Sequence, residues 1–146
     1  MKQKTMMRSC ILPADSEIIW EKLKEMKTLQ YIAFPYAVFK PAEHTGMRWQ
    51  AGQTSRFYFR LFGLIPLGIH TITIKTFDAE TKTIISQEHN RFVPRWEHTI
   101  CLKKQSGGTR YTDEVTIAAG WKTPFVFLWA KAFYAHRQKK WLRLLQ

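Results

Sequence analysis

The sequence predicts an α+β fold in which one antiparallel β-sheet packs against a long C-terminal helix. Apolar and polar residues alternate through most of residues 37–117, which is the pattern of strands with one buried face. The connections between these strands are too short to hold crossover helices, which favours an antiparallel meander. From residue 123 to about residue 145 the pattern is helical, over roughly 22 residues or ~33 Å. The 146 residues are expected to form a single domain, residues 1–146.

The N-terminal region predicts a strand followed by two short helices. Residues 6–12 form the expected strand, and Pro13 ends it. Asp15 is placed to cap the next helix, because its carboxylate can accept a hydrogen bond from a free backbone N–H. A second helical turn is expected over residues 28–33, and Pro35 ends it. The first helix has one apolar stripe, formed by Ile19, Leu23 and Met26 beside Trp20.

Six further strands and one helix complete the expected order of elements. Short segments that contain Gly, Pro, Asn or Asp separate the strands, as in antiparallel hairpins. Thr123 is expected to be the N-cap of the last helix, with Pro124 at its first position, where the missing N–H costs nothing. The six strands are residues 37–40, 54–62, 69–77, 83–89, 95–103 and 110–117.

Several short motifs accompany this order of elements. They are Pro13-Ala14 with Trp20, Leu61-Phe62-Gly63, Trp96-Glu97-His98, Thr112-Asp113-Glu114-Val115, and Phe133 with Arg137. In order and spacing they resemble the START-like superfamily called SRPBCC, which includes the pollen-allergen and polyketide-cyclase types. The resemblance covers nearly all residues and implies a helix-grip fold, a curved sheet wrapped around the C-terminal helix. It also implies an apolar cavity between sheet and helix, and a ligand-binding scaffold without a particular reaction.

Charge is unevenly distributed along the chain. The sequence has 23 Lys and Arg against 11 Asp and Glu, and its net charge is +12. This charge favours anionic partners: nucleic acid, acidic lipid or a charged small molecule. All acidic residues lie at or before Glu114, and the six basic residues that follow are Lys122, Lys131, Arg137, Lys139, Lys140 and Arg143.

The composition excludes several classes of protein. Hydrophobic residues make up 45% of the chain, which excludes disorder. Two cysteines are too few for a disulfide framework. The longest apolar stretch, residues 124–130, is far below the ~18 residues of a membrane-spanning helix. Because no secretory signal is visible either, the sequence favours a cytoplasmic protein.

Alternation along the strands assigns the residues of the sheet interior. On residues 54–62, for example, Phe57, Phe59 and Leu61 share the apolar face and are expected to point inward. We expect this interior, together with one side of the last helix, to bind the ligand. The predicted ligand-binding residues are Phe57, Phe59, Leu61, His70, Ile72, Ile74, Trp96, His98, Ile100, Tyr111, Asp113, Val115, Phe125, Trp129 and Phe133.

Two ionisable residues, His98 and Asp113, fall on this otherwise apolar interior. A tight hairpin between their strands pairs Ile100 with Asp113, whereas a loop two residues longer pairs His98 with Asp113 directly. In either register the two side chains are within reach, and a buried carboxylate needs a partner. The pair is therefore a satisfied polar pair, a handle for a ligand head group, or a general acid/base pair, although no residue pattern marks a nucleophile.

The two ends of the predicted sheet differ in polarity. The turns at residues 78–82 and 104–108 and the loop at 42–53 are mostly polar, whereas the connections at the opposite end are apolar. These apolar loops either close a small core or form the mouth of a cavity. In the second case, this end of the protein is expected to dock on an anionic membrane. The predicted mouth residues are Leu64, Ile65, Leu67, Phe92, Val93 and Trp121, beside the basic residues Arg91, Arg95, Lys122 and Lys131.

No metal or cofactor is expected. The five histidines include no pair at the spacing of a zinc site. Cys10 and Cys101 are expected about two strand spacings apart, near 10 Å, which exceeds the reach of a disulfide. Arg137 either stacks on neighbouring aromatic rings or occupies a solvated position on the helix.

Three functions follow from these features. The leading one is a carrier or sensor of a hydrophobic or amphipathic small molecule, exchanged at a membrane surface. The second is a cyclase- or hydrolase-like enzyme that uses His98 and Asp113. The third is a basic protein that binds nucleic acid or anionic lipid. Nucleic acid is the weakest prediction, because no recognised nucleic-acid-binding motif is present.

Overall fold

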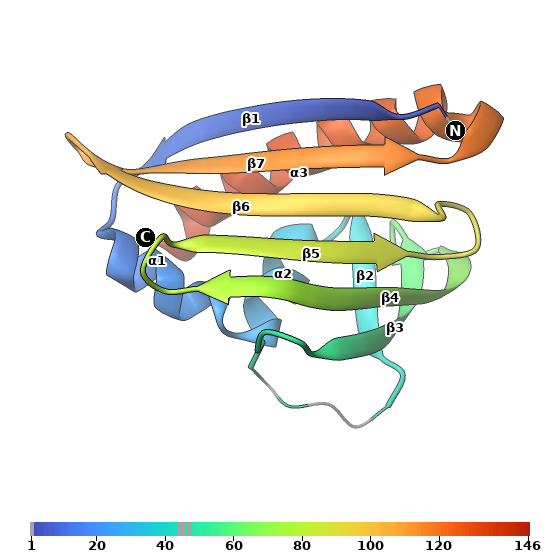
Figure 1. The fold of residues 1–146 in the computed structure, drawn as a ribbon, viewed down its shortest axis with the longest axis horizontal. Coiled ribbons are helices and arrows are strands. Elements are labelled where there is room, and N and C mark those ends of the chain that lie inside the picture. Colours follow the sequence, from blue (N-terminus) through green and yellow to red (C-terminus); the bar gives the residue numbers. More distant parts are fainter. Residues whose placement is uncertain (1, 44–45, 47) are drawn as a thin grey trace.

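A curved antiparallel sheet holds the long C-terminal helix on its concave face (Figure 1). The computed structural model describes residues 2–43, 46 and 48–146, so residues 44, 45 and 47 of the predicted 42–53 loop lie outside it. The described residues form a seven-stranded sheet of order β1-β7-β6-β5-β4-β3-β2. This is the predicted helix-grip α+β fold. Its elements are β1 (Lys4–Leu12), α1 (Ser16–Leu23), α2 (Met26–Ala33), β2 (Ala37–Pro41), β3 (Thr54–Leu61), β4 (Ile65–Asp78), β5 (Thr83–His89), β6 (Arg95–Gln105), β7 (Gly108–Ala118) and α3 (Thr123–Leu144).

Helix α1 lies at the end of the sheet where β1 finishes, and α2 lies closer to the middle, behind β4 and β5 in this view (Figure 1). Asp15 is the N-cap of α1, as predicted, and its Oδ1 accepts a hydrogen bond from the backbone N–H of Glu17 at 2.9 Å. Trp20 is buried and its ring packs against Phe77, with ring centroids 4.9 Å apart. This contact anchors α1 to the sheet.

The pairing of the strands confirms the antiparallel meander. The β6–β7 hairpin takes the tight register, which pairs Ile100 with Asp113. Strand β4 begins at Ile65, four residues before the predicted start at residue 69. The earlier start is possible because the β3–β4 turn is very short: Phe62 and Gly63 both adopt positive φ, 54° and 72°, which lets Leu61 pair with Ile65.

Gly108 is the first residue of β7 and lies beside Leu12, the last residue of β1. Its φ is +142°, and a Cβ there would overlap the carbonyl oxygen of Leu12. Only glycine allows this close approach of two backbone segments. Gly108 therefore fixes the place at which β7 and the end of β1 meet.

Helix α3 crosses the concave face behind β1, β7 and β6 (Figure 1). Phe133, Tyr134 and Trp141 are fully buried against the sheet. The prediction that Thr123 caps α3 is wrong, because a short 3₁₀ turn (Gly120–Lys122) precedes the helix and Lys122 occupies the N-cap. The Thr123 hydroxyl instead closes that turn: it donates to the carbonyl oxygen of Gly120 at 2.7 Å and accepts from the N–H of Ala119 at 2.9 Å.

In residues 2–43, 46 and 48–146, no helix is both long enough and apolar enough to cross a bilayer. Helix α3 has sufficient length, but its second half contains Lys139, Lys140 and Arg143. Charges at that depth of a bilayer are costly.

Candidate functional site

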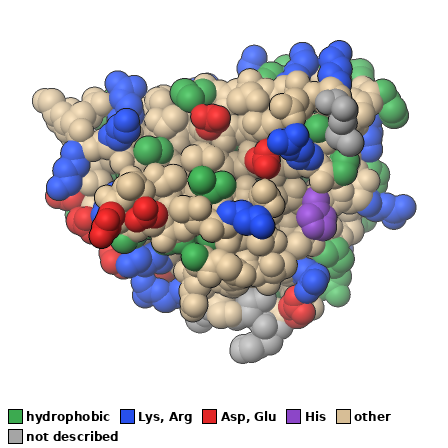
Figure 2. Space-filling view, in the orientation of Figure 1, with side chains coloured by type: hydrophobic (Ala, Val, Ile, Leu, Met, Phe, Trp, Pro, Cys, Tyr) green, Lys and Arg blue, Asp and Glu red, His purple; other side chains and the backbone are tan. Residues whose placement is uncertain are grey.

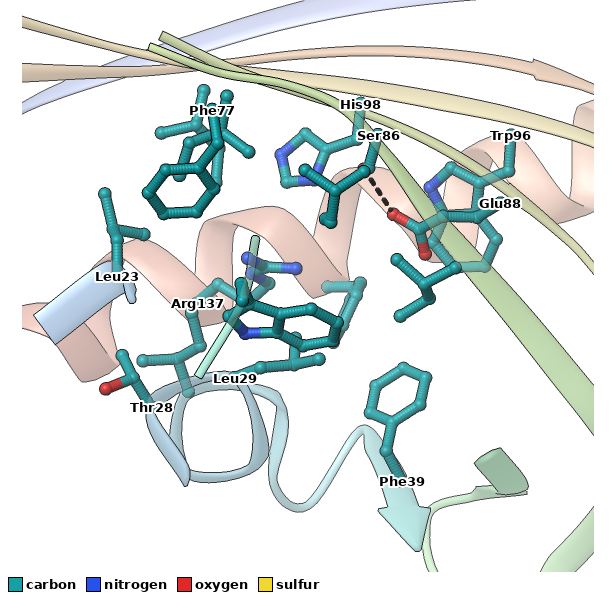
Figure 3. Close-up of a pocket in the computed structure, with 17 residues that line it drawn as sticks. Leu23, Thr28, Leu29, Phe39, Phe77, Ser86, Glu88, Trp96, His98 and Arg137 are labelled. Carbon is teal, nitrogen blue, oxygen red and sulfur yellow. Dashed lines mark hydrogen bonds between the residues drawn. The ribbon is translucent and has the colours of Figure 1, made fainter. Parts of the chain in front are cut away.

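A cavity of about 70 Å³ lies between the concave face of the sheet, α1 and α2, and α3 (Figure 3). Its wall is mostly apolar. Leu29 comes from α2, Phe39 from β2 and Phe133 from α3, and the sheet contributes Ile74 and Trp96. A second set of lining residues is polar or charged, and consists of Thr28, Ser86, Glu88, His98 and Arg137.

Some of the predicted ligand-binding residues line this cavity, and others do not. The lining includes Ile72, Ile74, Trp96, His98, Ile100 and Phe133. Phe57, Phe59, His70, Tyr111, Asp113 and Val115 are buried in the surrounding core, as their alternation predicts, while Leu61 and Trp129 are partly buried. Phe125 is a correction. It is 70% exposed, because the first turn of α3 extends beyond the part of the helix that the sheet covers.

The sequence did not predict the contributions of α1, α2 and β5 to the wall. Alternation along the strands shows which strand residues face the interior. It does not show which residues of α1 and α2 pack against that interior, because those contacts form only when the chain folds. Strand β5 did carry such a signal: Ile84, Ser86 and Glu88 alternate and are all buried. The missed lining residues are Leu23, Thr28, Leu29, Ile32, Phe39, Trp49, Phe77, Ile84, Ser86, Glu88 and Arg137.

His98 and Asp113 form the predicted contact. Nε2 of His98 lies 2.6 Å from Oδ1 of Asp113, and both residues are buried. The second carboxylate oxygen of Asp113 accepts a hydrogen bond from Nε2 of Gln138, at 3.0 Å, and the same amide nitrogen donates to the carbonyl oxygen of Arg8. The His98 ring also packs edge-on against Tyr134, with centroids 4.9 Å apart. Of the bonded pair, only His98 reaches the cavity wall.

A second histidine–carboxylate pair lies beside the first. Nε2 of His70 is 2.8 Å from Oε1 of Glu88, and Ser86 donates its hydroxyl to Oε2 of Glu88 at 3.0 Å (Figure 3). Nδ1 of His70 lies 3.0 Å from the side-chain nitrogen of Asn90. The sequence placed His70 inside but did not predict Glu88 as its partner. Glu88, unlike His70, lines the cavity.

The surroundings keep Glu88 ionised. Burial raises the pKa of a carboxyl group, but the hydrogen bond from His70 and the charges of His70, His98 and Arg137 outweigh burial. The pKa of Glu88 therefore lies below its usual value. The cavity wall consequently carries a carboxylate at neutral pH.

Arg137 is buried, not solvated, and is 5% exposed. Its guanidinium lies over the rings of Phe133 and Tyr134, at 5.5 and 5.1 Å from their centroids. Burial lowers the pKa of Arg137, but Tyr111, Tyr134, Asp113 and Glu88 raise it above its usual value, so the group is charged. Figure 3 shows the side chain reaching from α3 toward the middle of the lining residues.

The predicted mouth residues divide into two groups. Leu64 and Trp121 are each 80% exposed, and Ile65 and Phe92 are exposed as well. Leu67 is partly buried against the core. Val93 is buried, which corrects its prediction: the Asn90 side chain accepts hydrogen bonds from the backbone N–H of Phe92 and Val93, and this folds the loop inward. Among the described residues that line the cavity, none belongs to the predicted mouth.

The exposed apolar residues at this end form a surface that we call the apolar end. Basic side chains lie over two aromatic rings. Lys122 and Arg91 lie over the ring of Phe92, which belongs to the apolar end, and Lys4 and Lys131 lie over that of Phe127, which is partly buried beside it on α3. Figure 2 shows hydrophobic and basic side chains together at the edge where Figure 1 places the start of α3. The apolar end consists of Leu64, Ile65, Phe92, Trp121, Phe125 and Leu128.

The described part of the chain contains no cluster of three or more His, Cys, Asp or Glu side chains that could hold a metal ion. Cys10 and Cys101 are both free thiols. Burial and the nearby charge of Asp113 raise the pKa of Cys10 to about 11. This thiol is therefore protonated, and a poor nucleophile, at neutral pH.

Comparisons with known proteins agree with this architecture. The family described as "Domain of unknown function (DUF8410)" matches residues 10–145. Protein MLL2253 from Mesorhizobium loti has a similar structure, with a TM-score of 0.72 and 17% identity over 97% of this chain and 96% of that one. Ara h 8.0201 has a TM-score of 0.66 and 12% identity, over 97% and 99% of the two chains. The ginseng major latex-like protein 151 from Panax ginseng has a TM-score of 0.66 and 10% identity, over 94% of each. A search of curated proteins finds no match to the sequence.

Proposed function

The chain belongs to the DUF8410 family and has the fold of SRPBCC/START-like proteins, and on this basis we propose that it binds a small hydrophobic or amphipathic molecule. The ligand occupies the cavity between the sheet and α3. The protein then acts as a carrier or sensor of this molecule. The observation that carries the proposal is the cavity itself, an apolar space in the middle of the core with a few polar groups in its wall.

The composition of the wall supports this function. Ligand sites are usually apolar clefts in which a small number of polar groups orient the ligand. Ile74, Trp96 and Phe133 supply the apolar surface here, and His98 and Arg137 supply polar groups. The superfamily that the sequence resembles is also one of ligand-binding scaffolds.

The volume of the cavity limits the size of the ligand. An engineered apolar cavity of about 150 Å³ binds benzene, whereas the cavity here is about 70 Å³. A ligand of a few heavy atoms fits without rearrangement. A longer apolar body displaces side chains of the wall, and the lining residues Leu29 and Phe77 are only partly buried, which leaves them room to move.

The apolar end is proposed to dock on an anionic membrane, where the ligand is exchanged. Exposed aromatic and aliphatic side chains bury apolar surface in the boundary of a bilayer. Lys122 and Arg91 lie over the ring of Phe92, and Lys4 and Lys131 lie over that of the partly buried Phe127. Each basic residue near an anionic surface contributes ~1 kcal/mol of attraction. Exposed apolar side chains with basic side chains beside them suit an acidic lipid surface, because such a surface offers both an apolar interior and anionic headgroups.

Titration of the protein with a small apolar fluorophore, followed by its fluorescence, tests the binding function. We expect the fluorophore to bind the wild-type protein with one site per chain. The Ile74→Phe variant adds volume inside the cavity and is expected to weaken binding at least about tenfold. The control is Ile18→Phe, the same substitution at an exposed position on α1. Equal binding by wild type and both variants would show that the fluorophore does not occupy this cavity and would contradict the proposal.

A further inference from the structure

Among the described residues, no carboxylate lies within ion-pair distance of the buried guanidinium of Arg137. In residues 2–43, 46 and 48–146 it forms no ion pair, and its Nε is buried without a hydrogen bond. Its guanidinium lies over the faces of Phe133 and Tyr134, and the Tyr111 side chain lies beside it. A buried charge without a partner lowers stability, because aromatic rings replace only part of the lost hydration.

The two buried carboxylates nearby do not supply that partner. Oε1 of Glu88 is bonded to His70 and its Oε2 to Ser86. Oδ1 of Asp113 is bonded to His98 and its Oδ2 to Gln138. Every carboxylate oxygen therefore already has a hydrogen-bonding neighbour, and the guanidinium is left facing the cavity.

The cavity is where a partner for Arg137 can sit. Arg137 and His98 both line it, and other parts of its wall are formed by apolar side chains such as Leu29 and Phe39. A guanidinium binds a carboxylate with two parallel hydrogen bonds, which fixes orientation as well as affinity. The site thus combines a cationic donor on α3 with an apolar wall a short distance away.

We infer that the ligand is an apolar monocarboxylic acid whose carboxylate binds Arg137. The inference rests on the proposed function and names the chemical class of its ligand. The apolar body lies against the wall formed by α2 and β2.

Matched acids and alcohols test the inference on the wild-type protein. Butyrate, hexanoate and octanoate are titrated beside butanol, hexanol and octanol by calorimetry. We expect each acid to bind about tenfold more tightly than its alcohol, which is the ratio given by one charge-assisted hydrogen bond. Equal binding, or tighter binding of the alcohols, would overturn the inference and leave the proposed function intact. Binding of neither series would overturn both.

Variants of Arg137 test whether this residue causes the preference for acids over alcohols. Arg137→Met is expected to reduce the ratio of acid affinity to alcohol affinity to about one. Arg137→Lys keeps the charge without the two-pronged geometry and is expected to retain part of the preference. Lys139→Met removes an exposed charge from the same helix and is the control. An acid preference that survives in Arg137→Met would contradict the role of this residue, and circular dichroism checks that each variant is folded.

Discussion

Asp113 and His98 are diagonal neighbours on β7 and β6, and Nε2 of His98 lies 2.6 Å from Oδ1 of Asp113. The tight hairpin register brings them together, because it pairs Asp113 with Ile100, and His98 is two residues before Ile100 on β6. Gln138 of α3 holds the other carboxylate oxygen. A single carboxylate thus joins two neighbouring strands to the C-terminal helix.

Removal of this carboxylate is expected to destabilise the protein. Asp113→Ala leaves His98 and the Gln138 amide without their partner in the core, so the free energy of unfolding should fall by about 3 kcal/mol. Urea unfolding followed by circular dichroism measures the change. Glu114→Ala, at the exposed neighbouring position, is the control. A loss below about 1 kcal/mol in Asp113→Ala would show that the pair contributes little.

Glu88 is expected to make stability depend on pH. Its pKa in the folded protein lies below the usual 4.5, so its contribution is fully present above about pH 4.5 and is lost as the pH falls through the lowered pKa. Glu88→Gln should lower the free energy of unfolding by about 2 kcal/mol at neutral pH. The difference from wild type should shrink as the solution is acidified below pH 4.5. A difference that grows with acidification would contradict this account.

Gly108 is expected to tolerate no side chain. Gly107 and Gly108 both have positive φ, but only at Gly108 would a Cβ meet backbone, that of Leu12. Gly107→Ala should cost about 1 kcal/mol, which is the cost of the backbone conformation alone. Gly108→Ala should cost clearly more, because two backbone segments must separate. Thermal unfolding of the two variants compares them directly, and equal losses would contradict the close approach.

The apolar end is expected to bind anionic vesicles. Trp121→Ser and Phe125→Ser remove two exposed aromatic side chains, and the double variant should bind mixed phosphatidylcholine and phosphatidylserine vesicles at least about tenfold more weakly. Tyr58→Ser, at an exposed position on β3, is the control. Co-sedimentation measures binding. Wild-type binding that is absent, or equal on pure phosphatidylcholine, would contradict docking through an acidic lipid surface.

The sheet and its faces could be predicted because alternation is a local signal. Phe57, Phe59 and Ile72 point inward as expected, since side chains alternate strictly along a strand. The same period could not distinguish the two registers of the β6–β7 hairpin. A shift of two residues leaves Asp113 on the same face, and only the closed turn decides between them.

The shape of the site depended on contacts that no local pattern encodes. Leu29 reaches the cavity from α2, and Trp49 reaches it from the segment between β2 and β3, so neither belongs to an alternating strand. Val93 is buried because the Asn90 side chain accepts a hydrogen bond from its backbone N–H and folds the loop inward. The hydrophobicity of the loop alone does not predict this contact. For Arg137 the sequence left two alternatives open, stacking on aromatic rings or a solvated position on the helix. Its burial depends on how α3 packs against the sheet, which the sequence of the helix does not show.

Native mass spectrometry of the purified protein tests the central claim, that the cavity holds a ligand. The account predicts a species heavier than the polypeptide by the mass of one small molecule, and predicts its loss from Ile74→Phe but not from the exposed control Ile18→Phe. Extraction with organic solvent should then release a compound with an apolar body. A wild-type protein that shows only the mass of its polypeptide, and that binds none of the titrated acids or alcohols, would contradict the account.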